Sequence, residues 1–104
     1  MLNHTQLDRY ADILVWGLRT ARIRPFKKGD IILLRFNIDA VGLAEILEAR
    51  LLEMGMNPVR RMSPTPEMEK NFFHLANQRQ LVFDPPGEAD LYRHLNGSIF
   101  LHAP

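Results

Sequence analysis

A short apolar run from Ile31 to Phe36 (IILLRF) constrains the fold more than any other feature of this 104-residue chain. The run is nearly continuous and begins with β-branched residues, which favour an extended strand. A strand with apolar side chains on both faces is typical of a parallel sheet, in which helices cover both sides. The sequence around this run is therefore expected to supply helices.

A helix is expected before this strand, over residues 5 to 21. We expect Thr5 to cap its amino terminus, with Asp8 completing a variant of the capping box. Pro25 stops its continuation, and residues 27 to 30 (KKGD) are typical of a turn. The apolar residues recur at helical spacing: Leu7, Tyr10, Ala11, Leu14, Val15 and Leu18.

A second helix and a second strand follow the apolar run. The helix is expected over about residues 40 to 54, with Asn37 and Asp39 as candidate N-caps and Gly55 as its C-cap. The strand covers Pro58 to Met62 (PVRRM), where the leading proline and the two arginines favour an edge position.

The last third of the chain predicts two more helices and a strand. Thr65 is a candidate N-cap and Pro66 suits the first position of a helix that is expected to run to about Gln80. A short helix from Glu88 to Leu95 and a strand from Ser98 to His102 complete the sequence.

This order of elements predicts one α/β domain over residues 1–104. Strands that alternate with helices form parallel sheets, and right-handed crossovers give the strand order 2-1-3. We expect a small three-layer Rossmann-like domain with Ile31, Leu33, Ile99 and Leu101 buried in adjacent parallel strands. Because the sheet would be small and the chain stops just after a strand, we expect a fragment of a larger protein. Such a fragment should expose unusual apolar surface or self-associate.

Composition excludes several classes of protein. There are no cysteines, so disulfides, thiolate zinc sites and thiol catalysis are absent. With 13 Lys and Arg against 12 Asp and Glu, the net charge of +1 argues against a dedicated nucleic-acid binder and against a polybasic membrane-binding protein. The longest apolar stretch, Ile13 to Leu18, is too short to span a bilayer. No secretory signal opens the chain, so we expect a cytoplasmic location.

No catalytic, cofactor-binding or metal-binding residue is assigned from the motifs. The loops after the strands lack a glycine-rich phosphate cradle. The four histidines, His4, His74, His94 and His102, form no short-spaced metal pair. Ser63, Thr65 and Ser98 lack a nucleophile elbow.

One segment resembles a nucleic-acid patch locally, because it gathers cations beside aromatic residues. The overall charge favours a solvated helix end followed by a basic turn. The residues are Arg19, Arg22, Arg24, Lys27 and Lys28, flanked by Trp16 and Phe26.

Several short motifs carry a resemblance to a known family. Tyr10 to Val15 (YADILV), then Lys28-Gly29-Asp30 and the apolar strand, resemble the start of the thermophilic-type metalloaminopeptidases, metallopeptidase family twenty-nine. An Ala- and Leu-rich helix ending in glycine, Leu43 to Gly55, fits the same layout, as do Gln80 to Phe83 (QLVF) and Ile99 to Leu101 (IFL). The resemblance covers most of the chain.

The resemblance implies a non-catalytic amino-terminal domain of a metal-dependent aminopeptidase. Divalent metal ions and catalytic residues would belong to a carboxy-terminal domain absent from this chain. The expected role is to pack on that domain, to shape substrate access, or to contribute to a homodimer. Two other hypotheses stay open, namely a free-standing α/β binding or protein-interaction module and, less favoured, a small nucleic-acid-binding domain that uses Arg19 to Lys28.

Overall fold

The computed structural model describes residues 3–20 and 26–103. Its elements, in chain order, are α1 (His4–Thr20), β1 (Ile31–Phe36), the 3-10 turn η1 (Ile38–Ala40), α2 (Val41–Glu53), β2 (Asn57–Met62), α3 (Pro66–Leu75), α4 (Gln78–Leu81), α5 (Glu88–His94) and β3 (Gly97–Leu101).

The three strands form one parallel sheet in the order β2-β1-β3. The predicted α/β class, the parallel sheet and its 2-1-3 order are confirmed, and β2 lies at an edge as expected. Both connections between strands contain helices, as parallel pairing requires. The register sets Leu34 between Arg60 of β2 and Ile99 of β3.

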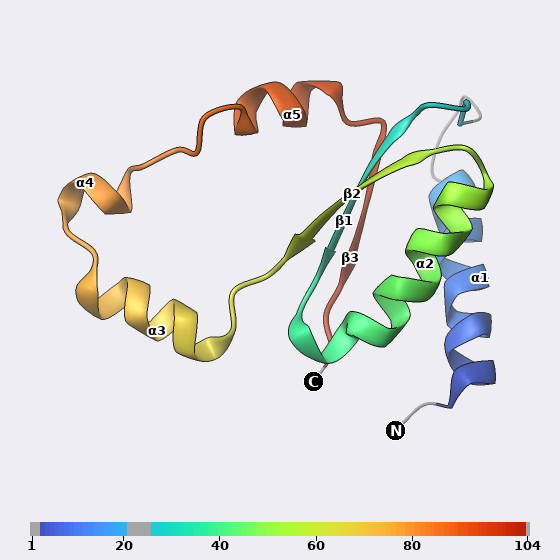
Figure 1. Cartoon of the computed structure of the whole chain (residues 1–104), viewed down its shortest axis with the longest axis horizontal. Helices are drawn as coiled ribbons and strands as arrows, with labels where there is room; N and C mark the ends of the chain where they lie inside the picture. Colours follow the sequence, from blue (N-terminus) through green and yellow to red (C-terminus); the bar gives the residue numbers. More distant parts are fainter. Residues whose placement is uncertain (1–2, 21–25, 104) are drawn as a thin grey trace.

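Helices α1 and α2 lie side by side over one face of the sheet, which we call the covered face (Figure 1). Ile32 and Leu34 of β1 point into this layer and are fully buried, together with Leu47 and Leu51 of α2. These side chains form the core because helical spacing on α2 meets two-residue alternation on β1.

The amino-terminal cap of α1 differs from the expectation. Asn3 Oδ1 accepts a hydrogen bond from the backbone N–H of Gln6 (2.8 Å), and Gln6 Oε1 accepts one from the N–H of Asn3 (2.9 Å). This reciprocal pair is a capping box. The predicted Thr5 cap with Asp8 is therefore wrong, because the amide pair begins the helix two residues earlier.

The expected N-caps of the second helix are also wrong. A 3-10 turn occupies residues 38–40, so α2 begins at Val41 with Ala40 in the cap position. The Asn37 side chain bonds instead to the backbone of Ala103, through Oδ1 to N–H (3.0 Å) and Nδ2 to C=O (2.6 Å). Gly55 follows α2 with a φ of +80°, the left-handed conformation for which glycine was predicted there.

The third helix begins as predicted and ends early. Thr65 Oγ1 accepts a hydrogen bond from the N–H of Met68 (3.2 Å), and Pro66 occupies the first turn. The helix ends at Leu75 rather than near Gln80. Asn77 and Gln80 form a second capping box, which starts the separate helix α4.

The opposite side of the sheet, which we call the open face, is covered much less. Of the four strand residues expected in the core, Ile99 and Leu101 are buried on the covered face, in register with Leu34 and Phe36. On the open face Leu33 is buried, whereas Ile31 is half-buried. Helix α5 supplies the layer on the open face.

Residues 66–83, with α3 and α4, form an arm that swings away from the sheet (Figure 1). No residue of α3, α4 or α5, all of which the structure describes, is buried. The radius of gyration is 15.7 Å, whereas a compact chain of about 100 residues has about 13 Å. The arm therefore adds surface without adding core.

Candidate functional site

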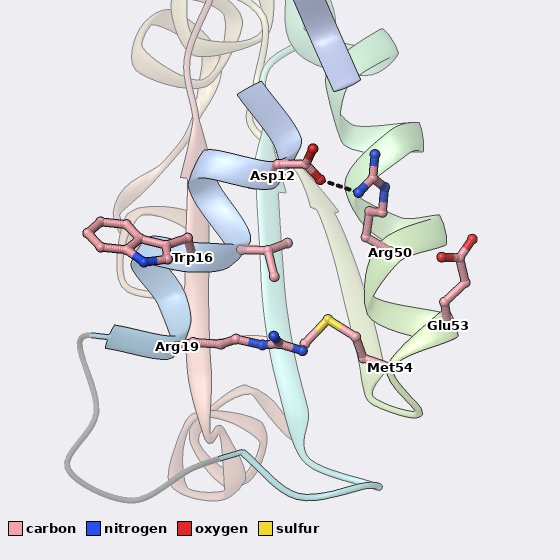
Figure 2. Close-up of a pocket in the computed structure, with 7 residues that line it drawn as sticks. Asp12, Trp16, Arg19, Arg50, Glu53 and Met54 are labelled. Carbon is pink, nitrogen blue, oxygen red and sulfur yellow. Dashed lines mark hydrogen bonds and ion pairs between the residues drawn. The ribbon is translucent and has the colours of Figure 1, made fainter. Parts of the chain in front are cut away.

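A cavity of about 340 Å³ lies between the second halves of α1 and α2 (Figure 2). Two guanidinium groups and two carboxylates line it, so their charges balance and favour no ionic ligand. The exposed ring of Trp16 stands at one side. Its lining residues are Asp12, Val15, Trp16, Arg19, Arg50, Glu53 and Met54.

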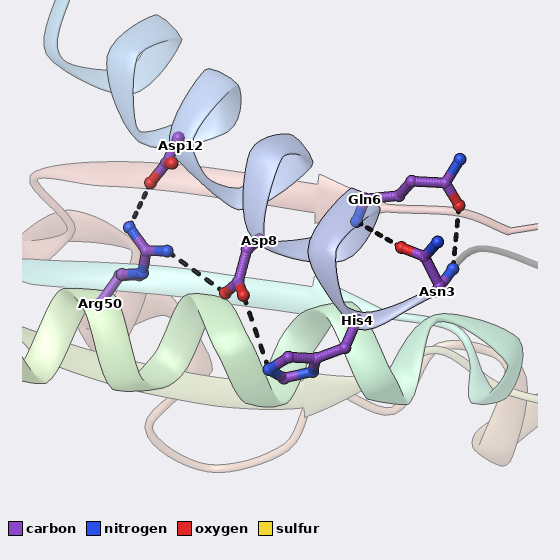
Figure 3. A network of polar contacts seen from close by, with 6 residues as sticks. All are labelled: Asn3, His4, Gln6, Asp8, Asp12 and Arg50. Carbon is purple, nitrogen blue, oxygen red and sulfur yellow. Dashed lines mark hydrogen bonds and ion pairs between the residues drawn. The ribbon is translucent and has the colours of Figure 1, made fainter.

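Arg50 joins α2 to α1 through two carboxylates (Figure 3). Its Nη1 donates to Asp12 Oδ1, and its Nη2 lies 3.3 Å from Asp8 Oδ1. Partial desolvation lowers the pKa of Arg50, but the charges and hydrogen bonds of Asp12 and Asp8 outweigh it, so the pKa is raised. This network fixes one helix on the other and leaves little of the guanidinium free for a ligand.

The open face carries an unusual row of side chains near the carboxyl ends of the strands. Arg35 of β1 lies in register with Arg61 of β2 on one side and with Phe100 of β3 on the other. Like charges directly opposite each other on neighbouring strands repel. Phe100 is 64% exposed, and the Arg35 guanidinium lies 5.7 Å from the centre of its ring.

Helix α5 satisfies part of this row. The Tyr92 hydroxyl accepts a hydrogen bond from Arg35 Nη2 (3.1 Å), and Glu88 Oε1 lies 3.5 Å from Arg61 Nη2. The Arg35 Nε is buried and has no hydrogen-bond partner within the described part of the chain. A buried donor without an acceptor is unfavourable. The described part of the open face therefore lacks an acceptor for the Arg35 Nε.

The arm presents a second apolar surface. A shallow groove of about 470 Å³ runs along it between α3 and the residues after α4. Phe73 and Val82 are each 81% exposed, which is unusual for side chains of this kind. The groove is lined by Asn71, Phe72, Leu75, Ala76, Gln80 and Phe83.

The four histidines lie on separate parts of the surface. His4 Nε2 is 3.5 Å from Asp8, and His94 Nδ1 lies 2.7 Å from the Asp90 carbonyl oxygen. His74 packs edge-on against Phe73, and His102 is exposed after β3. Across residues 3–20 and 26–103, no three His, Asp or Glu side chains are grouped so that they could hold a metal ion.

The remaining candidates have structural roles or stay separate. The Thr65 hydroxyl caps α3, while Ser98 is exposed on β3. Arg19, Lys27 and Lys28 of the basic segment are exposed. Arg22 and Arg24 lie outside the described residues.

The sequence motifs missed the residues that make the open face distinctive. Arg35 and Arg61 were treated only as parts of strands, and Tyr92 and Glu88 as parts of a short helix. The available signal was a charged residue within a run otherwise buried on both faces, because such a charge requires a partner.

A protein-family model covers residues 3–104, and its description is thermophilic metalloprotease (M29). The chain belongs to the thermophilic metalloprotease (M29) family. The predicted resemblance is thus confirmed over almost the whole chain. No curated protein and no solved structure matches the chain.

Membership of the M29 family brings a requirement for metal, since its members are metal-dependent. The described residues do not fit that requirement, because their histidines and carboxylates are dispersed or paired with arginines. No helix in the described ranges is long and apolar enough to cross a membrane.

Proposed function

We propose that this chain is a non-catalytic amino-terminal domain of a metal-dependent aminopeptidase. In this proposal the domain docks through its arm and open face on a catalytic domain that carries the metal. The observation that carries the proposal is the concentration of exposed apolar side chains on one half of the molecule. Of the fifteen large apolar side chains that are exposed among the described residues, nine lie on the arm, α5 and the open face, namely Met68, Phe72, Phe73, Leu75, Leu81, Val82, Phe83, Tyr92 and Phe100. The other six are Tyr10, Ile13, Trp16, Ile38, Leu52 and Met62.

The size and placement of this surface favour a permanent neighbour. Exposed apolar patches larger than a few hundred Å² usually mark an interface or a binding groove. Aromatic side chains are enriched at the centres of such interfaces. Here they lie along the arm from Phe72 to Phe83, and Phe100 is a separate exposed ring on the open face of the sheet.

Docking there would give the arm a role in catalysis without a catalytic residue. An arm that leaves the domain body can lie along a neighbouring domain and narrow the approach to its active site. Burial of its aromatic side chains would also stabilise the arm, which contributes no buried residue to its own domain.

The test compares the 104-residue chain with the polypeptide extended to the stop codon of its reading frame. Dialysed samples are analysed for bound metal and assayed on leucyl, aspartyl and aromatic amides with added zinc, cobalt or manganese. We expect turnover and about one or more metal equivalents per chain only in the extended protein.

Substitutions then connect that activity to the arm. In the extended protein, Phe73→Asp together with Val82→Asp should impair domain docking and lower kcat/KM. Leu52→Asp is the matched control, since Leu52 is also exposed (55%) but belongs to α2. A stop codon directly after Pro104 would contradict the proposal, as would stoichiometric metal and turnover by the chain alone that His74→Ala or His102→Ala abolishes.

The groove on the arm also favours an alternative, a free-standing module that binds an apolar peptide or protein segment. This alternative predicts the same loss of binding in the Phe73 and Val82 variants but no dependence of aminopeptidase activity on the arm. Self-association of the chain through the arm is a further outcome, detected as a concentration-dependent mass.

A further inference from the structure

We propose that Arg35 and Arg61 form a carboxylate-binding subsite on the open face. Its ligand would be an Asp or Glu side chain, flanked by apolar residues, on the protein segment that covers this face. The inference rests on the proposed docking function and adds the chemistry by which the partner is recognised.

The row of side chains on the open face carries more positive than negative charge. Arg35 and Arg61 are directly opposite in the β1–β2 register, and both side chains are on the open face. Glu88 is the carboxylate that faces them, and it lies 3.5 Å from Arg61 alone. Within residues 3–20 and 26–103, the positive charge of Arg35 on this row therefore has no ion-pair partner.

The hydrogen-bond donors of Arg35 are only partly used by the described residues. A guanidinium has five N–H donors in a planar fork. Nη2 of Arg35 donates to Tyr92, a neutral phenol, whereas Nε is buried and unpaired among the described residues. A carboxylate can accept two parallel N–H bonds from one guanidinium. Because the buried Nε cannot be reached directly, an incoming carboxylate would supply the missing counter-charge and accept from the Nη groups of the same guanidinium.

The side chains around the two arginines favour a protein segment over a small anion as the ligand. The arginines are bordered by Phe100, which is 64% exposed, and by the half-exposed ring of Tyr92. A free anion would pair with the guanidinium groups and leave both rings in water. A segment with an acidic residue between apolar neighbours would cover the rings and pair with the arginines at once, so the surface favours a protein partner.

Arg60, which precedes Arg61 on β2, shows the opposite case. Arg60 has the opposite side-chain orientation and its Nε lies 2.8 Å from Glu48 Oε2 of α2. The sequence thus gives a direct carboxylate partner to the arginine that faces the covered face. On the open face no carboxylate of the described residues pairs with Arg35, which leaves this position for a carboxylate of the partner.

The experiment uses the 104-residue chain labelled with ¹⁵N, whose arginine Nε–H signals report directly on the unpaired donor. The probes are two peptides, acetyl-Phe-Asp-Leu-amide and acetyl-Phe-Asn-Leu-amide, which differ only in the carboxylate. Binding of such short peptides is expected in the millimolar range, about −4 kcal/mol. We expect the Asp peptide to shift the Arg35 Nε–H signal and to bind about fivefold or more tightly than the Asn peptide.

Two variants test the assignment to the arginine pair. Arg35→Lys keeps the charge but removes the planar fork, so the preference for the Asp peptide should disappear. Arg60→Lys is the matched control and should keep the full preference. If Arg35→Lys fails to fold, Arg61→Lys replaces it, because that side chain is 44% exposed and should be tolerated.

Each outcome decides the proposal. Equal binding of the two peptides, with shifts at Phe100 and Tyr92, overturns the subsite but leaves the docking function standing. Absence of any shift from either peptide up to about 10 mM overturns the subsite as well. An Asp preference that depends on Arg35, found together with an extended protein whose activity ignores the arm, supports the subsite and overturns the docking on a catalytic domain.

Discussion

The covered face and the open face of the sheet are built from the same three strands but differ in how their side chains are buried and paired. On the covered face, α1 and α2 bury Ile32 and Leu34, and Arg60 pairs with Glu48. On the open face, one short helix reaches the sheet, and the Arg35 Nε has no acceptor among the residues that the structure describes. The arm leaves its aromatic side chains in water. The first face holds the domain together, and the second has the composition of an interface.

This difference means that most of the free energy of folding comes from one half of the molecule. Burial of apolar surface is the largest favourable term in folding, and here it is concentrated between β1 and the helices α1 and α2. Changes on the covered face should therefore affect stability, whereas changes on the arm should affect association.

The largest expected effect is a contrast between two truncations of large apolar side chains. Leu34→Ala, at a fully buried position on the covered face, should lower the free energy of unfolding by about 2–5 kcal/mol. Phe73→Ala on the arm should change it by less than about 0.5 kcal/mol, because the ring is already in water. Urea denaturation measures both. Similar losses would mean that the arm belongs to the core.

The next effect concerns Asn37, which ties the end of β1 to Ala103. Asn37→Ala removes two partly buried hydrogen bonds and should lower the free energy of unfolding by about 1–3 kcal/mol. Asn37→Asp keeps the acceptor for the Ala103 N–H but loses the donor to its C=O. Its free energy of unfolding should therefore lie between those of the unchanged protein and Asn37→Ala. A neutral result for Asn37→Ala would show that the segment after β3 does not stabilise the sheet.

Asn37 also shows where prediction from the sequence stopped. The class, the strand order and the edge position of β2 followed from local patterns, because apolar runs and helical spacing are set by neighbouring residues. The role of Asn37 did not, since its partner lies 66 residues away and the same side chain is a good N-cap by local rules. The helix boundaries were missed for a different reason, since Asn3 with Gln6 and Asn77 with Gln80 are capping pairs only three residues apart that compete with other local caps.

The open face was predictable only in part. The expectation of excess apolar surface came from the unpaired edge of the third strand and from five methionines, three of them near β2, whereas many of the exposed apolar side chains lie on residues 66–83. The Arg35 row depends on the β1–β2 register, which brings together residues 26 positions apart. Sequence patterns do not specify such pairings until the strand order and register are known.

A smaller effect is expected from Arg50, which holds α1 on α2 at the edge of the covered face. Arg50→Ala should lower the urea midpoint, and the difference from the unchanged protein should shrink at high salt because these pairs are partly exposed. The pKa of Arg50 is raised, so its contribution is fully present below the usual arginine pKa and is lost only as pH rises through the higher folded value.

The Arg50 effect should accordingly be the same at about pH 6 and about pH 9. Arg93→Ala is the matched control, since Arg93 pairs with Asp90 inside α5 and joins no second element. A drop in the urea midpoint for Arg93→Ala as large as that for Arg50→Ala would show that Arg50 does not stabilise the protein by linking α1 to α2.

The smallest effect on global stability is expected from the cap of α3, and it tests whether the arm is independent of the sheet. Thr65→Ala removes the acceptor for the Met68 N–H and should destabilise α3 by about 1 kcal/mol. Hydrogen exchange of α3 amides should then be about fivefold faster, while the urea midpoint of the sheet stays unchanged. Asn77→Ala, which removes the cap of α4, should act in the same way on its own helix. If either change lowered the midpoint as much as Asn37→Ala, the arm would unfold together with the sheet. In the extended protein the same caps should matter more, because a docked arm cannot open without losing its contacts with the catalytic domain.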